Sequence, residues 1–308
     1  MRLADLEAPA LRRLLARGEL LLATPPFVVR VTSDLPQVAE ALHFLYRDFG
    51  VLPPDRFSDF RVEVRRVSGV RGWLKPQARF SVDGREAFLP LPQDHAPVML
   101  EWGLNWCVVA HAHQYLILHA AVVERDGRAL ILPAPPGSGK STLCAALAHR
   151  GWRLLSDELA LCDLRTGTVS GMARPVNLKN QSVELISRFA PEARFSRSIA
   201  GTAKGTLSLM CPPAEAVSRV CEAARPGWIV LPRYGAGEAT TLSPIARTEC
   251  FMEVTEQAYN YNVHGAAGFS GLARLVGEAE CFRLVHGDLD AAVALLDALA
   301  PQTVKTER

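Results

Sequence analysis

The chain has 308 residues, of which 49% are hydrophobic and 21% are charged, and its formal net charge is +2. This length accommodates two domains of ordinary size or one large one, and the apolar fraction predicts a packed globular core. A nearly neutral chain is not typical of proteins that bind nucleic acid or an anionic membrane through general electrostatics, so we expect neither as a partner.

The cysteines and the apolar runs indicate an intracellular environment. The seven cysteines include no Cys-x-x-Cys pair and fit no zinc-ligand spacing, so we interpret them as buried, reduced thiols. Residues Met1–Glu7 carry acidic side chains where a signal peptide would have its apolar core. The run Leu104–Val123 comes closest to a spanning helix, but three histidines and Gln114 interrupt it. We therefore expect a cytoplasmic protein.

Residues 1–97 predict a small α/β domain with an antiparallel sheet. Residues 1–22 are expected to form a short helix and residues 27–31 a strand, after which Asp34 caps a second helix. Further strands are expected over residues 60–67, 78–82 and 87–91, with a hairpin turn at Asp83-Gly84 between the last two. No chemical constellation stands out here, so we interpret this part as a recognition or assembly domain.

Residues 98–308 predict a second α/β domain. A helix over 98–114 is followed by a hairpin whose turn is Arg125–Gly127, and its second strand runs directly into a Gly-rich segment. A helix over 141–150 and a strand over 152–155 follow. The order is therefore strand, Gly-rich loop, helix, strand, and a further strand and helix close the chain.

The stretch Ala134–Thr142 reads APPGSGKST and matches the phosphate-loop pattern G-x-x-x-x-G-K-[S/T], with Ala134 in the first position. Backbone N–H groups at the start of the next helix can bind phosphate, Lys140 can reach the β- and γ-phosphates, and Ser141 can ligate Mg²⁺. The sequence therefore predicts ATP as the nucleotide and Mg²⁺ as the metal. The residues expected to contact the nucleotide are Pro136, Gly137, Ser138, Gly139, Lys140, Ser141 and Thr142.

Two carboxylates follow the next strand, and Asp157 comes 17 residues after Lys140. One helix is long enough to return the chain, so we expect this strand to lie beside the loop strand, with its carboxyl end near the γ-phosphate. Asp157 is then the candidate general base, and Glu158 assists the metal or shares the role of the base. Candidate metal ligands are Ser141, Asp157 and Glu158. The alternative is a surface acidic pair that caps the next turn.

The span Leu116–Leu161 resembles the core of the HPr kinase/phosphorylase family, and the whole chain is most similar to the related proteins called HPr-related kinase A. The matching features are His119, the loop from Gly137 to Ser141, Arg150-Gly151 and the pair Asp157-Glu158. The later segments GTAKGTLSL, WIVLPRYGAG and AYNYNVHGAAGF fit as well, so the resemblance covers about residues 100–300. The family motif begins with Gly and its acidic pair is usually Asp-Asp, whereas this chain has Ala134 and Asp157-Glu158.

The resemblance implies a P-loop kinase core of the HPr kinase type and phosphoryl transfer from ATP to a hydroxyl. The implied acceptor is a serine on a small HPr-like protein or peptide, and a homo-oligomer is left open. His119 resembles the active-site histidine of the family, where it would orient a phosphate or tune the carboxylate. A half-buried structural histidine is the alternative.

Phosphoryl transfer requires cations beyond Lys140. Lys204 is the strongest candidate, because Gly201 and Gly205 would let its loop close over a phosphate. Arg174, Lys179 and Arg233 are further candidates, and for each of them an ordinary solvated charge is the alternative. The cluster Tyr259-Asn260-Tyr261-Asn262 would contact the base or the acceptor, or else pack with its polar tips satisfied.

Two other functions fit the same loop. A small-molecule P-loop kinase also places an acidic residue shortly after the loop, although no basic lid stands out here. A regulatory module that binds a nucleotide without turnover is the third interpretation, and the Ala134 departure favours it. The acidic pair in the position of a base favours transfer instead.

Overall fold

The computed structural model describes residues 1–69, 75–202 and 205–300. They form two compact units, and each unit combines helices with sheets, which confirms the α/β class. The first unit comprises residues 1–112, 172–184 and 193–219, and the second comprises residues 113–171 and 185–192 and the chain from residue 220 onward. The first unit therefore contains residues 98–112 and two later segments in addition to the expected 1–97.

The first unit is built on a sheet with the strand order β3-β1-β2-β4-β5-β6, in which β7 also pairs with β5. Its strands are β1 (Leu20–Thr24), β2 (Phe27–Ser33), β3 (Gly50–Leu52), β4 (Phe60–Arg66), β5 (Gln77–Val82), β6 (Arg85–Glu86) and β7 (Leu91–Pro92). Its long helices are α1 (Ala8–Arg17), α2 (Pro36–Leu45) and α4 (Ala96–His111), and short 3₁₀ turns span Leu3–Asp5 and Gln93–His95.

This sheet is mixed, so the expectation of an antiparallel sheet is wrong at one pair. β2 and β4 are parallel, whereas the other neighbouring strands are antiparallel. Parallel neighbours need a crossover, and the chain between β2 and β4 supplies one that includes α2. Every second residue of β4 is buried, namely Phe60, Val62 and Val64. One face of the sheet therefore packs on the core of this unit.

Three local expectations in the first unit differ from the structure. The helix expected over residues 1–22 is only α1, because Gly18 ends it in the left-handed region at φ +68°, and β1 follows. The strand expected over 87–91 is replaced by the short β6 and β7. Asp34 does not cap α2, since its carboxylate accepts a hydrogen bond from the Arg66 N–H at 3.0 Å and Leu35 occupies the N-cap.

A smaller sheet with the order β13-β15-β14 also belongs to the first unit. Its strands are β13 (Val176–Lys179), β14 (Ile199–Thr202) and β15 (Gly205–Met210), and α7 (Ala214–Ser218) follows it. Helix α6 (Gln181–Phe189) lies between β13 and β14 in the chain.

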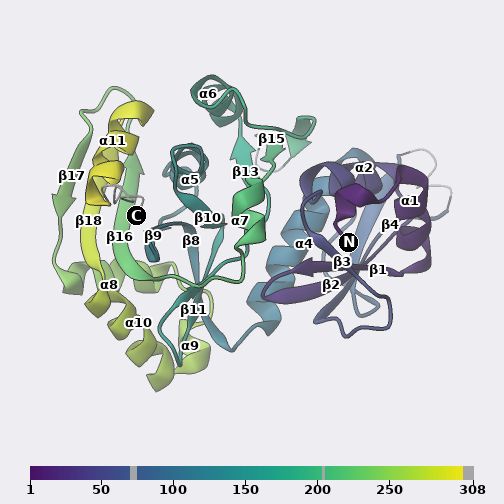
Figure 1. Cartoon of the computed structure of the whole chain (residues 1–308), viewed down its shortest axis with the longest axis horizontal. Helices are drawn as coiled ribbons and strands as arrows, with labels where there is room; N and C mark the ends of the chain where they lie inside the picture. The colour runs from purple at the N-terminus through teal and green to yellow at the C-terminus, as the bar shows by residue number, and fades with distance from the viewer. Residues whose placement is uncertain (70–74, 203–204, 301–308) are drawn as a thin grey trace, which may run out of the picture. The chain divides into compact units, whose positions relative to one another are not determined.

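The second unit contains a sheet with the strand order β12-β11-β8-β9-β16-β18-β17, in which β10 also pairs with β8 (Figure 1). Its strands are β8 (Tyr115–Arg125), β9 (Arg128–Pro133), β10 (Arg153–Ser156), β11 (Leu159–Asp163), β12 (Val169–Ser170), β16 (Arg225–Tyr234), β17 (Thr241–Pro244) and β18 (Glu280–His286). Its helices are α5 (Lys140–Ala148), α8 (Arg247–Glu256), α9 (Tyr261–His264), α10 (Ala266–Glu278) and α11 (Leu289–Leu299).

The central strands of this sheet are buried on both faces. On one face, Leu116, Leu118 and Ile131 pack with residues of α8 and α10, including Val254 and Leu272. Side chains alternate along a strand, so the intervening residues point to the other face, where α5 contacts β8 and β10 and α11 contacts α5 and β18. His119 belongs to this second set, on the same face as the helix that follows the Gly-rich loop.

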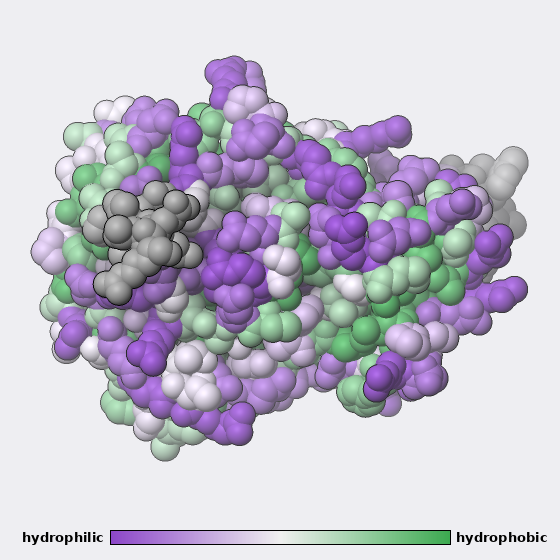
Figure 2. Space-filling view, in the orientation of Figure 1, coloured by the Kyte–Doolittle hydropathy of each residue, from purple (hydrophilic) through white to green (hydrophobic). Residues whose placement is uncertain are grey.

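The helices and the surface were compared for their content of hydrophobic residues. No helix in the described part of the chain is both long enough and apolar enough to cross a membrane. Hydrophilic and hydrophobic residues are interspersed over the face that Figure 2 shows, and one group of hydrophobic residues gathers over the first unit.

Candidate active site

The Gly-rich loop connects β9 to α5, as the sequence predicts. Gly137 has φ +90° and Gly139 has φ +91°, a region that only glycine adopts readily. Gly139 occupies the N-cap of α5, so Lys140 begins the first turn of that helix. Ala134 is buried and has no positive φ, so this position does not require glycine. The substitution at the first position of the motif therefore introduces no backbone strain.

The acidic pair lies at the junction of two strands that both pair with β8. β10 pairs with the second half of β8, β11 pairs with its first half, and the register shifts between Leu154 and Ser156. β8 thus lies between β10 and β9, and the expectation that β10 adjoins the loop strand is wrong. The reason is that β8 pairs with β9 on one edge and with β10 and β11 on the other. β9 and β10 still run in the same direction, since each is antiparallel to β8.

The structure joins two predicted residues, His119 and Glu158. His119 Nε2 lies 3.1 Å from Glu158 Oε2, and each side chain is 14% exposed. The backbone supports this contact, because the Ala120 N–H donates to the Glu158 carbonyl at 3.2 Å and Leu159 is the register partner of His119. Glu158 has φ +77°, an uncommon conformation for a residue with a side chain, and such residues cluster at functional sites.

Asp157 is buried, and its surroundings connect it to α5. The thiol of Cys144, on that helix, donates to the Ser156 carbonyl at 3.7 Å. Burial raises the pKa of Cys144 well above its usual value, and the negative charge of Asp157 raises it further. Asp157 therefore lies within electrostatic range of the helix that begins at Lys140. Lys140 is buried as well, with 5% of its surface exposed.

The ring of Tyr259 packs against that of His119. The two ring centroids are 5.8 Å apart. Burial of the phenol, together with the charge of Glu158, raises the pKa of Tyr259 to about 12, although 49% of the residue is exposed. Three side chains from distant parts of the chain, His119, Glu158 and Tyr259, thus meet at the point where β9 ends.

Asn260, in the cluster Tyr259–Asn262, bonds to the backbone of β8. Asn260 is buried, and its side-chain oxygen accepts from the Ile117 N–H at 2.9 Å while its amide donates to the Tyr115 carbonyl at 2.8 Å. These bonds attach the segment to β8 just beyond the end of β9. Asn260 therefore satisfies backbone groups, as the packing alternative proposes.

Sequence reasoning missed His286, which the fold places against the loop. His286 is the last residue of β18 and pairs in register with Tyr234, the last residue of β16. A Cβ placed on Gly139 would lie 2.9 Å from His286 Nε2. Burial lowers the pKa of His286, and the backbone of Ser138 acts in the opposite direction. The available signal was its position directly after the apolar pair Leu284-Val285, at the carboxyl end of a strand that runs in the same direction as β9.

The other predicted cations are distributed over both units. Arg233 forms a bidentate ion pair with Glu238, with hydrogen bonds of 2.8 and 2.6 Å, on the surface of the second unit. Arg174 and Lys179 belong to the first unit, where Arg174 is buried beside Glu101 at 3.6 Å. Lys204 lies outside the described residues.

No group of three or more His, Cys, Asp and Glu side chains that could hold a metal ion occurs within residues 1–69, 75–202 and 205–300. The candidate metal ligands Ser141, Asp157 and Glu158 carry oxygen donors, which is the ligand type that Mg²⁺ prefers. Mg²⁺ commonly completes its coordination with substrate phosphates and water, so a site of this kind is consistent with nucleotide-dependent binding.

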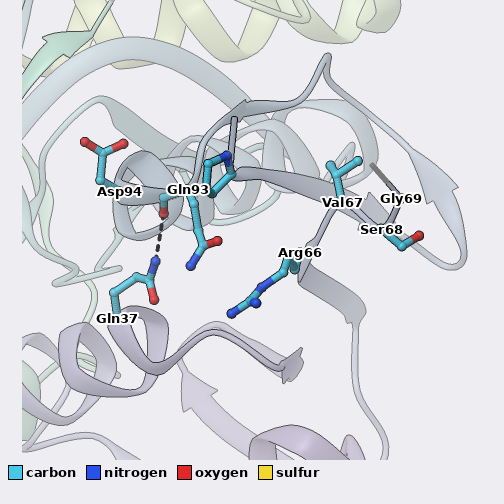
Figure 3. A pocket seen from close by; sticks show the side chains of 8 residues that line it. Gln37, Arg66, Val67, Ser68, Gly69, Gln93 and Asp94 are labelled. Carbon is cyan, nitrogen blue, oxygen red and sulfur yellow. Dashed lines mark hydrogen bonds between the residues drawn. The ribbon is translucent and has the colours of Figure 1, made fainter. Parts of the chain in front are cut away.

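A separate hollow of about 720 Å³ lies in the first unit (Figure 3). Arg66 extends toward Gln37 and Gln93 there, and the Gln37 amide donates to the Gln93 carbonyl at 3.0 Å. None of the residues predicted for the nucleotide site lines it.

A family model and solved structures match this chain. The family model of the SynChlorMet cassette protein ScmC matches residues 91–177, which is less than half of the chain and includes the loop and the acidic pair. A solved structure of the Hpr(Ser) kinase/phosphatase from Coxiella burnetii is 12% identical, covers 59% of this chain and 92% of its own, and has a TM-score of 0.25. No curated protein matches.

Proposed function

We propose that this chain is an ATP- and Mg²⁺-dependent kinase that phosphorylates a hydroxyl, specifically a serine on a small protein or peptide. The observation that supports this proposal most is the placement of an acidic pair beside the helix that follows a phosphate-loop motif, with Asp157 buried and the Glu158 side chain 14% exposed. Asp157 raises the pKa of Cys144 on α5, and Glu158 is held by His119. A loop that only bound a nucleotide would not need two desolvated carboxylates at this position.

The residues of the loop would bind the phosphates. Backbone N–H groups near Gly137 to Lys140 and the N-terminus of α5 attract negative charge, and the Lys140 ammonium adds a full positive charge. An ideal Cβ on Gly137 meets nothing within 4 Å, so the loop has open space there. Ser141 and the acidic pair would hold Mg²⁺, which neutralises charge that develops on the phosphoryl group.

Asp157 is our candidate for the general base. The acceptor oxygen would attack the γ-phosphorus, the bond between that phosphorus and the β–γ bridging oxygen would break, and ADP would leave. The hydroxyl proton would pass to the Asp157 carboxylate. Glu158, oriented by His119, would assist the metal or share the proton, and a cationic group such as Lys204 would balance the transferring charge.

The first unit is proposed as a recognition or assembly domain. The hollow near Arg66 supports recognition, since a guanidinium beside amide groups suits a polar segment of an acceptor. Removal of residues 1–97 is a poor test, because the first unit also contains residues 98–112, 172–184 and 193–219. Arg66→Ala is a better test: it should raise the KM for the acceptor and leave acceptor-independent ATP hydrolysis unchanged.

The decisive experiment is mass spectrometry of the purified chain with ATP and Mg²⁺, alone and with small proteins encoded beside its gene. Wild type and Asp157→Asn are compared, and ATP binding is measured for both. Addition of one phosphate to a partner serine by wild type, and its loss in the variant with ATP binding retained, supports the proposal. ATP binding without transfer to any protein would favour a small-molecule kinase or a binding module, and absence of ATP binding would contradict all three.

A further inference from the structure

The carboxyl ends of β16 and β18 place two rings beside the loop. Tyr234 and His286 are register partners in parallel strands, and their ring centroids are 5.6 Å apart at an interplanar angle of 63°. β9, which leads into the loop, is parallel to β16. Ligands of open α/β sheets bind beyond the carboxyl ends of such strands, so both rings lie at the edge where a ligand is expected.

The contact between these rings and the loop is direct. An ideal Cβ on Gly139 would lie 2.9 Å from His286 Nε2 and 3.7 Å from Tyr234 Cβ. His286 is only 3% exposed, and within the described part of the chain its Nε2 has no hydrogen-bond partner. The histidine therefore fills the space between the loop and Tyr234, and it supports one side of the tyrosine ring.

Tyr234 itself is 52% exposed, whereas the seven residues of β16 from Pro226 to Pro232 are buried. Its backbone is held in place by the turn that follows. The Gly235 N–H donates to the His286 carbonyl at 3.0 Å, and Arg233 is paired with Glu238 across the turn. The result is a solvent-facing aromatic ring on a fixed backbone, next to the last glycine of the loop.

We propose that Tyr234 is the surface on which the base of the bound nucleotide stacks. The proposal rests on the proposed binding of a nucleoside triphosphate by the loop, and it assigns the base to the β16–β18 side of that loop. Stacking uses the face of the base and not its edge, so this site should accept adenine and guanine alike. The Tyr234 hydroxyl contributes little, because the contact is made by the ring.

The test is calorimetric titration of the full chain, with Mg²⁺ present, against ATP, GTP and inorganic triphosphate. Inorganic triphosphate binds the loop without a base and reports on the phosphate site alone. Tyr234→Ala removes the ring, and Tyr234→Phe keeps the ring without the hydroxyl. Unfolding temperatures confirm that both variants are folded, which we expect because the side chain is half exposed.

We expect Tyr234→Ala to weaken ATP and GTP binding by about tenfold or more, since a base stacked on an aromatic residue typically contributes that much. Affinity for inorganic triphosphate should stay within about twofold, and Tyr234→Phe should behave as wild type. An equal loss for ATP and triphosphate, or no loss for either, would overturn the stacking role. If wild type binds neither ATP nor triphosphate, the proposed function fails and this inference fails with it.

Discussion

His119 lies in β8, and Glu158 directly precedes β11, the strand that pairs with β8 there. A distance of 3.1 Å separates His119 Nε2 from Glu158 Oε2. They are 39 positions apart in the chain, yet the backbone of Ala120 also bonds to the carbonyl of Glu158. The left-handed conformation of Glu158, with φ +77°, is thus stabilised by a side-chain contact and by a backbone hydrogen bond. An arrangement of this kind fixes the orientation of one carboxylate in a pair.

The first prediction concerns this contact. His119→Gln removes the imidazole and should lower ATP turnover by about ten- to hundredfold, the range that corresponds to one hydrogen bond to a charged group. The dissociation constant for ATP should change by less than about twofold, because His119 does not lie in the loop. Turnover and binding are measured on the same preparation. A parallel loss of ATP affinity would indicate that His119 supports the nucleotide site instead.

The two positive-φ glycines of the loop provide a matched pair. Gly139→Ala combines an unfavourable φ with a Cβ only 2.9 Å from His286 Nε2, whereas a Cβ on Gly137 meets nothing within 4 Å. Both variants should lose about 1–2 kcal/mol in the free energy of unfolding from backbone strain. Gly139→Ala should lose more, and it should also bind ATP more weakly.

Denaturant unfolding and ATP titration check this second prediction. The double variant Gly139→Ala with His286→Ala should recover part of the additional loss, because it removes the side chain that the new Cβ contacts. Equal destabilisation by the two single glycine variants would contradict the packing of His286 against the loop.

The hairpin of β8 and β9, the loop and the start of α5 could be predicted because their signals are local: an apolar run, a turn, a glycine motif and a helix. The position of β10 could not, since nothing near Arg153–Ser156 shows that β8 pairs on both edges. Such pairing is decided by residues far apart in the chain.

The candidate site shows the same limit. Lys140 and the acidic pair were predicted because they belong to a short motif and follow a nearby strand. His286 was not, because its contact with Gly139 depends on β18 lying next to β16. Asn260 has side-chain chemistry that suits a ligand, but the fold uses it to satisfy the backbone of β8. The order of the strands in the folded sheet distinguishes His286, which lies beside the loop, from Asn260, which bonds to the backbone.

His286 also predicts a pH dependence of stability. Burial lowers its pKa in the folded chain below the usual value of 6.5, so the unfolded chain binds a proton first as the pH falls. Its contribution to the free energy of unfolding is therefore complete above about pH 7.5 and declines as the pH falls through 6.5 toward the folded pKa. His286→Gln should flatten this decline between pH 7.5 and 5.5. An unchanged slope in urea unfolding would show that His286 titrates normally.

The last prediction separates a structural from a catalytic role for Arg174. Arg174 and Glu101 are each 7% exposed in their side chains, and Tyr46 donates to Glu101 Oε1 at 2.6 Å. Burial raises the pKa of Glu101, and the Arg174 charge opposes that increase. Arg174→Ala leaves the carboxylate buried without its cation and should cost about 3–5 kcal/mol in the free energy of unfolding.

Arg233→Ala is the matched control, because its pair with Glu238 is on the surface and its loss should leave the free energy of unfolding nearly unchanged. The loss in Arg174→Ala should also grow as the pH rises from 5 to 8, since a Glu101 with a still higher pKa keeps a proton that the unfolded chain releases. Chemical unfolding at several pH values measures both effects. An Arg174→Ala variant that unfolds with wild-type stability would contradict this structural role.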